Sequence, residues 1–158
     1  MIGMSKIVKT IAAGIFPFIV IYGLYVIAHG HLTPGGGFQG GAIVASACAM
    51  IVVAYGSVWT MGKIKEKQLS LFESLGAVCF ILLAVLGLGF GTVFLENFLV
   101  GSNFLFGAIP GTGSTLADIN TGGIIPLMNF AVGVKVIVGL FAIVLIMAYA
   151  SSIRGETK

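Results

Sequence analysis

The chain has 158 residues and a net charge of +3; 58% of the residues are hydrophobic and 8% are charged, whereas charged residues make up about 25% of a typical soluble domain. Eight basic and five acidic residues cannot form the polar surface that a soluble domain of this size requires. The composition therefore excludes an ordinary soluble domain, a disordered chain and a nucleic-acid-binding domain with a basic face.

Four hydrophobic stretches are long enough to cross a membrane, for which a helix needs about 20 apolar residues. The candidate spans are residues 7–28, 38–61, 69–95 and 127–150. They do not alternate between apolar and polar residues as strands of a membrane barrel do, so their backbone groups must pair within helices. The sequence therefore predicts an all-α integral membrane protein with four transmembrane helices. It forms a single membrane domain over residues 1–158, with a long outer segment at 96–126.

The distribution of basic residues predicts the orientation in the membrane. All of them except Lys135 lie at the very start of the first stretch or just before it, between the second and third, or after the fourth. Because cytoplasmic loops carry the excess of Lys and Arg, both termini of this multi-pass protein are expected in the cytoplasm. Lys6 and Lys9 before an apolar run also resemble a secretory signal. The run is longer than a signal core of about 7–15 residues, which favours a retained helix.

A glycine-rich segment, H-G-H-L-T-P-G-G-G-F-Q-G-G, occupies residues 29–41. Pro34 resists continuation of the first helix, and Gly35 permits a tight turn, so the second helix is expected to start near Phe38. The segment also contains G-x-G-x-x-G. A membrane helix precedes it instead of a strand, and Thr60 stands where a dinucleotide site needs an acidic residue, so a nucleotide cofactor is not expected.

Pairs of glycines four residues apart predict faces where helices approach closely, because small residues allow backbone contact in lipid. Such pairs are Gly36 and Gly40, Gly37 and Gly41, and Gly87 and Gly91. We expect these faces to pack against other helices.

Lys135 is the most unusual ionisable residue, since it lies about eight residues into the fourth stretch, about 12 Å below its outer end. An unpaired charge there costs at least about 2.5–3.5 kcal/mol. Glu73, expected in the first turn of the third helix beside Lys67, and Glu96 are not placed to pair with it directly. A carboxylate of another subunit or a water-filled channel is therefore the expected partner, so that Lys135 borders an ion path. A local structural ion pair is the alternative for Lys135, and proton handling is the alternative for Glu73.

His29 and His31 form an H-x-H pair at the outer end of the first helix. A zinc or copper site normally needs three or four ligands, and only Glu96 and Asp118 could add to the pair on that side, so no metal is expected. The histidines either transfer protons near neutral pH or cap the helix and contact neighbours. Asn129 is expected to form a hydrogen bond between helices.

The H-G-H-L-T-P-G-G-G-F-Q-G-G segment resembles the signature of the MnhB/MrpB subunit family of multi-subunit Na⁺/H⁺ antiporters. Residues 121–136 resemble the fourth span of that family. Many bacterial members carry an acidic residue near the start of this span and lack the lysine, whereas this chain has Ala131 and Lys135. In this respect it is more similar to the subunits within archaeal ferredoxin-linked hydrogenase and sulfane-reductase complexes.

The resemblance implies a membrane subunit of a multi-subunit cation/proton antiporter module that lines or supports an ion path. Its expected partners are other antiporter-type subunits, the lipid bilayer and a ferredoxin-linked redox module. No catalytic, metal-binding or cofactor-binding motif is visible, so any enzymatic step belongs to other subunits. Two alternatives stay open: a structural scaffold with no role in ion movement, and an independent small transporter.

Overall fold

The computed structural model describes residues 3–90, 93–102, 104–109 and 120–156. Its helices are α1 (Lys6–Ala28), α2 (Gly36–Tyr55), α3 (Ser57–Lys63), α4 (Glu66–Phe90) and α5 (Ile124–Glu156). All of these except α3 are long and apolar enough to cross a membrane. The predicted all-helical fold with four spanning helices is therefore confirmed.

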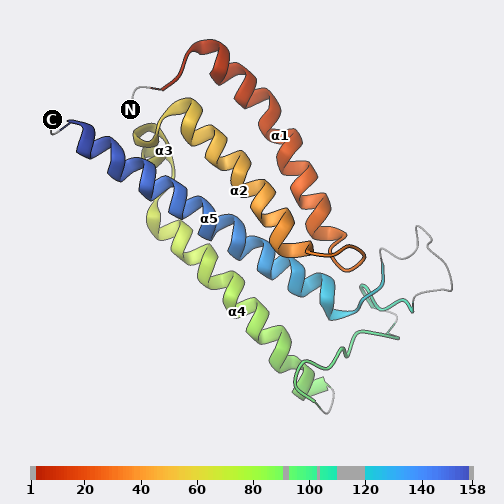
Figure 1. Cartoon of the computed structure of the whole chain (residues 1–158). Coiled ribbons are helices and arrows are strands. Elements are labelled where there is room, and N and C mark those ends of the chain that lie inside the picture. Colours follow the sequence, from red (N-terminus) through yellow and green to blue (C-terminus); the bar gives the residue numbers. More distant parts are fainter. Residues whose placement is uncertain (1–2, 91–92, 103, 110–119, 157–158) are drawn as a thin grey trace.

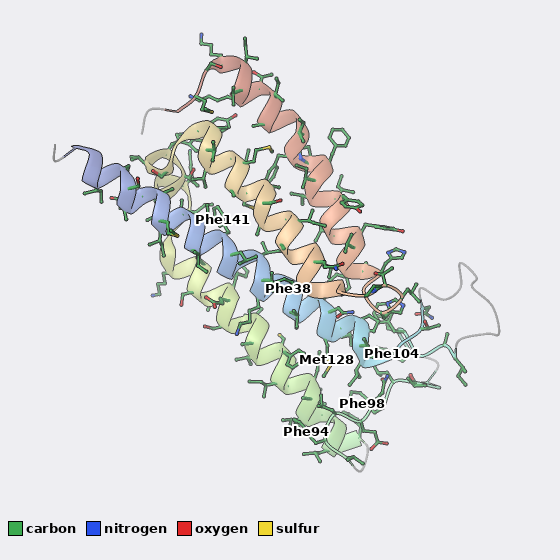
Figure 2. The ribbon with its side chains drawn as sticks, viewed as in Figure 1. Phe38, Phe94, Phe98, Phe104, Met128 and Phe141 are labelled. Atoms are coloured by element: carbon green, nitrogen blue, oxygen red, sulfur yellow. The ribbon has the colours of Figure 1, made fainter. Side chains whose placement is uncertain are left out.

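The four long helices lie side by side in a single layer, in the order α1, α2, α5, α4 (Figure 1). In the span of α2, 44% of the residues are buried, against 17% in the spans of α1 and α4. Over the described residues, the helices therefore form an open layer with α1 and α4 as its edges, rather than a four-helix bundle around an enclosed core. Side chains project from the layer along all four helices (Figure 2).

Both described ends of the chain lie at the same end of the layer as α3 (Figure 1). We call it the lysine end, because Lys6, Lys9, Lys63 and Lys65 belong to the segments there. The N-terminal segment is tied to α2 at this end, where the Met4 N–H donates a hydrogen bond of 2.9 Å to the Ala54 carbonyl.

The second helix differs from the prediction at both ends. It begins at Gly36 rather than near Phe38, because Gly35 makes the turn with a φ of 94°. It ends at Tyr55, so the prediction of one helix to residue 61 is wrong. Gly56 has φ 94° and ψ 148°, which only glycine adopts readily and which no helix can contain. The seven residues of α3 follow, about 10 Å long and too short to cross a membrane.

The other predicted boundaries shift by a few residues. The third helix is Glu66–Phe90 and not 69–95, because Leu95 has a φ of 63° and its N–H donates to the Ala84 carbonyl at 3.2 Å, so the chain folds back there. The fourth is Ile124–Glu156 and not 127–150, since the helix also includes the apolar residues 124–126 and the more polar residues 151–156.

Asn97, in the predicted outer segment, holds the start of α5. Its Oδ1 accepts a hydrogen bond of 2.8 Å from the Ile124 N–H, and its Nδ2 donates one of 2.9 Å to the Gly122 carbonyl. Asn97 therefore caps a helix that begins 27 residues later. Phe94, Phe98 and Phe104 lie at this end of the layer, opposite the lysine end (Figure 2).

Candidate functional site: the helix contacts and the Lys135 groove

The glycines of residues 29–41 set the contact between α1 and α2. A Cβ atom on Gly40 would lie 2.5 Å from the carbonyl oxygen of Gly23, and one on Gly36 would lie 2.7 Å from the Cα atom of Gly30. These are backbone atoms that cannot move aside. Gly36 and Gly40 therefore form the face of α2 that contacts α1 and the turn after it.

The second glycine pair faces the other neighbour. A Cβ atom on Gly37 would overlap the carbonyl oxygen of Asn129, and one on Gly41 would lie 3.0 Å from the carbonyl oxygen of Gly133. Both of these partners belong to α5. The two overlapping glycine pairs thus hold α2 between α1 and α5, and Pro34 and Gly35 form the turn before it.

Gly87 lies against a non-helical segment, whereas the glycine spacing predicts contact with another helix. A Cβ atom there would lie 2.7 Å from the backbone nitrogen of Glu96, so Gly87 accommodates the folded-back segment that follows its own helix. Gly91, its predicted pairing partner, lies outside the described residues, as does Asp118.

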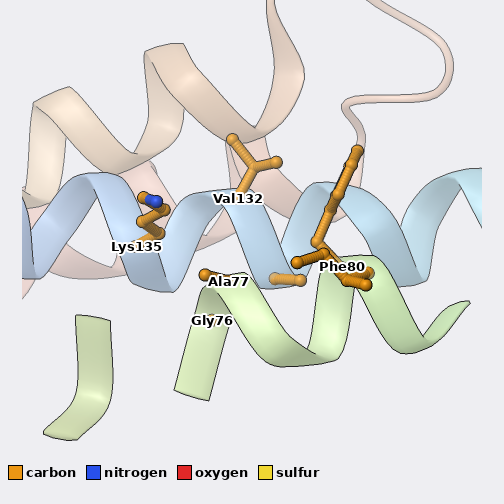
Figure 3. A pocket seen from close by; sticks show the side chains of 7 residues that line it. Gly76, Ala77, Phe80, Val132 and Lys135 are labelled. Atoms are coloured by element: carbon orange, nitrogen blue, oxygen red, sulfur yellow. The ribbon is translucent and has the colours of Figure 1, made fainter. Parts of the chain in front are cut away.

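Lys135 is exposed on α5, at the side of a groove of about 230 Å³ between α4 and α5 (Figure 3). Gly76 of α4 permits the close approach, since a Cβ atom there would lie 3.2 Å from the Cβ atom of Lys135. Phe80, Ile81 and Val132 also line the groove. Because α5 starts earlier than predicted, Lys135 lies about 16 Å along the helix from its start, deeper than the 12 Å expected from about eight residues.

Glu73 lies on the same contact between α4 and α5. The prediction that it occupies the first turn is wrong, because α4 begins at Glu66. A Cβ atom on Gly139 would lie 3.8 Å from Oε1 of Glu73, and Gly139 is one turn after Lys135 on α5. The carboxylate thus lies beside the α5 turn that follows Lys135, and no hydrogen bond or ion pair links the Lys135 side chain to another residue in the described ranges.

The two histidines have different neighbours. Nδ1 of His29 lies 3.1 Å from the Tyr25 carbonyl oxygen, and the His29 and Tyr25 rings are 4.0 Å apart. His31 lies against Gly122 before α5, where a Cβ atom would be 3.2 Å from its Cδ2 atom. Within the described residues, no three His, Cys, Asp or Glu side chains gather as metal ligands do.

Asn129 lies where α2 and α5 meet the turn after α1. Its Nδ2 atom is buried and has no hydrogen-bond partner in the described part of the chain. A Cβ atom on Gly30 would lie 2.8 Å from that nitrogen. Nδ2 therefore makes no interhelical hydrogen bond there, and an interhelical hydrogen bond of Asn129 stays a prediction. Asn97 makes long-range polar contacts at this end, which sequence reasoning missed because the partners are distant in the chain.

A layer of four apolar spanning helices with an exposed lysine inside one of them defines a multi-pass membrane protein. Residues 7–142 match the family described as a domain related to the MnhB subunit of Na⁺/H⁺ antiporters. The chain belongs to this family, as the resemblance of the glycine-rich segment indicates.

Two individual proteins are also similar to the chain. An uncharacterized protein of Methanocaldococcus jannaschii is 40% identical over 139 residues, which cover 86% of this chain and 49% of that protein. A chain in the structure of the membrane-bound sulfane sulfur reductase, an archaeal respiratory membrane complex, has a TM-score of 0.67 and 31% identity. That match covers 91% of this chain and 58% of the other. The chain thus spans about half the length of these relatives.

Proposed function

We propose that the chain is a membrane subunit of a multi-subunit Na⁺/H⁺ antiporter module, and that Lys135 and Glu73 border its ion path along the contact between α4 and α5. The observation that carries the proposal is the position of Lys135, exposed within a spanning helix. In a bilayer, that charge faces either lipid or another protein.

Lipid is the costly alternative. A lysine at the centre of a spanning helix costs at least about 2.5–3.5 kcal/mol in lipid. This cost is removed if a partner subunit covers the groove and provides a carboxylate or a chain of water molecules. Glu73, whose carboxylate lies near Gly139 in the α5 turn after Lys135, adds a second ionisable group to the same contact between α4 and α5. Intramembrane groups arranged in this way are typical of ion and proton pathways.

The similar proteins support a role within a larger assembly. The family is described by the MnhB subunit of a Na⁺/H⁺ antiporter, and the similar structure is an archaeal respiratory membrane complex that reduces sulfane sulfur. We propose that this chain, too, works beside antiporter-type subunits, with a ferredoxin-linked redox module as the source of energy. The alternative, a scaffold with no role in ion movement, draws support from the glycine contacts of α2.

The test replaces Lys135 in the assembled complex. We expect Lys135→Ala to lower Na⁺-dependent proton transport in membrane vesicles about tenfold or more, because the partner charge loses its counter-ion. Lys135→Arg, which keeps the charge, should retain more activity. Lys65→Ala, at the lysine end, is the matched control and should transport normally.

Co-purification of the other subunits shows whether each variant still assembles. Normal transport by an intact Lys135→Ala complex contradicts the ion-path proposal and supports the scaffold. Robust cation flux by the chain alone in vesicles contradicts the subunit assignment.

A further inference from the structure

A pocket of about 370 Å³ lies at the lysine end, between α1, α2, α3 and α5. This volume falls in the range of about 300–1,000 Å³ that small-molecule sites occupy. The interior is apolar, with Phe16 from α1, Ile51 from α2 and Phe141 from α5 among the residues that line it. It is separate from the Lys135 groove, which α4 and α5 form.

The break at Gly56 produces this pocket. Because α2 stops at Tyr55 and the chain changes direction, α3 stands beside the end of α2. Trp59 of α3 then stacks on Tyr55, with ring centroids 4.7 Å apart and ring planes at 27°. Both rings line the pocket. Tyr and Trp at the end of a spanning helix mark the level of the lipid headgroups.

Two cations lie beside this aromatic pair. Lys63, the last residue of α3, lines the pocket. The Nζ atom of Lys9 lies 5.7 Å from the centroid of the Tyr55 ring, on the α1 side. Among the side chains that the structure describes, no aspartate or glutamate lines the pocket. The site therefore combines an apolar interior with a positively charged rim at headgroup depth.

We infer that this pocket binds one anionic phospholipid, with the phosphate between Lys63 and Lys9 and an acyl chain along Phe16 and Phe141. Basic pockets between spanning helices recognise anionic headgroups in this way. The apolar interior requires a ligand with a hydrocarbon chain, which a free phosphate lacks. The cationic rim selects an anionic headgroup over a zwitterionic one.

Trp59 is an intrinsic reporter, because it is the only tryptophan of the sequence and it lines the pocket. The experiment reconstitutes the full chain in phosphatidylcholine vesicles that contain a small fraction of phosphatidylglycerol with brominated acyl chains. Bromine quenches tryptophan fluorescence on contact. We expect the quenching by brominated phosphatidylglycerol to saturate. In the mirror experiment, in which the phosphatidylcholine carries the bromine instead, the same mole fraction of brominated lipid should quench only weakly.

Matched variants distinguish a specific lipid-binding site from a general attraction of anionic lipids to the lysine end. Lys63→Gln should weaken the preference for phosphatidylglycerol about fivefold, since each basic residue at the surface contributes about that factor. Lys65→Gln removes the same charge two residues away, outside the pocket lining, and should leave the preference unchanged. Ala13→Phe fills the pocket from α1 and should abolish the saturable component. Circular dichroism verifies that each variant keeps its helices.

Equal quenching by the two brominated lipids overturns the proposal, and so does an equal loss in Lys63→Gln and Lys65→Gln. Saturable quenching that persists in a folded Ala13→Phe variant also overturns it, because the acyl chain then lies elsewhere. None of these results depends on ion transport, so they do not bear on the role of Lys135.

Discussion

At the scale of single residues, the contacts of α2 depend on the absence of side chains. Gly40 lies against the backbone of Gly23, and Gly37 lies against the backbone of Asn129. Helices in lipid gain little from the hydrophobic effect and associate through close packing. One added methyl group at these positions therefore weakens the packing that holds the helices of the layer together.

We predict that Gly40→Ala lowers the free energy of unfolding by about 1–3 kcal/mol, because the new Cβ atom would lie 2.5 Å from a carbonyl oxygen. Gly14→Ala in α1 is the matched control, since nothing lies within 4 Å of a Cβ atom there. Unfolding in sodium dodecyl sulfate, followed by circular dichroism, measures both variants. Equal stability of the two variants would contradict the assigned contact.

At the scale of elements, Gly56 divides one hydrophobic stretch into two helices. Its φ of 94° and ψ of 148° lie in a region that is nearly closed to residues with a side chain. The short α3 is therefore oriented by a backbone conformation and then held by the stacking of Trp59 on Tyr55.

We predict that Gly56→Ala destabilises this break by about 1–3 kcal/mol, because alanine must adopt a strained conformation or straighten the chain. Either result separates the two stacked rings, so the emission maximum and the quencher accessibility of Trp59 should change. Gly62→Ala, within α3 and with nothing within 4 Å of its Cβ atom, should leave the spectrum unchanged. An unaltered spectrum in Gly56→Ala would show that the glycine conformation does not determine the orientation of α3.

At the scale of the whole molecule, the open layer leaves large apolar side chains uncovered. Phe18 on α1 is 73% exposed, Ile81 on α4 is 61% exposed and Met147 on α5 is 68% exposed. Such a surface is stable only against lipid or other membrane subunits. This arrangement agrees with the proposed hetero-oligomeric assembly.

Four crossings return the chain to the side where it began, and we propose that this side is the cytoplasm. A green fluorescent protein fused to the C-terminus should therefore fluoresce. Alkaline phosphatase inserted after Gly101, which is exposed and has open space around it, should be active, and insertion after Lys65 should be inactive. The opposite pattern of activities would reverse the assignment from the lysines.

The amino-acid sequence by itself determined the number of spanning helices and the turn at Pro34 and Gly35, because hydrocarbon thickness and backbone conformation act on local segments. The resemblance of residues 29–41 to a family signature also indicated the family, which the match over residues 7–142 shows. Only the tertiary structure decided which glycine faces which helix, since both pairs have the same spacing but opposite neighbours. It also decided the break at Gly56, because nothing in the residues next to Gly56 indicates that a helix ends there. The meeting of Glu73 with the turn after Lys135 arises from the antiparallel packing of α4 and α5, a relation between distant segments that no local pattern contains.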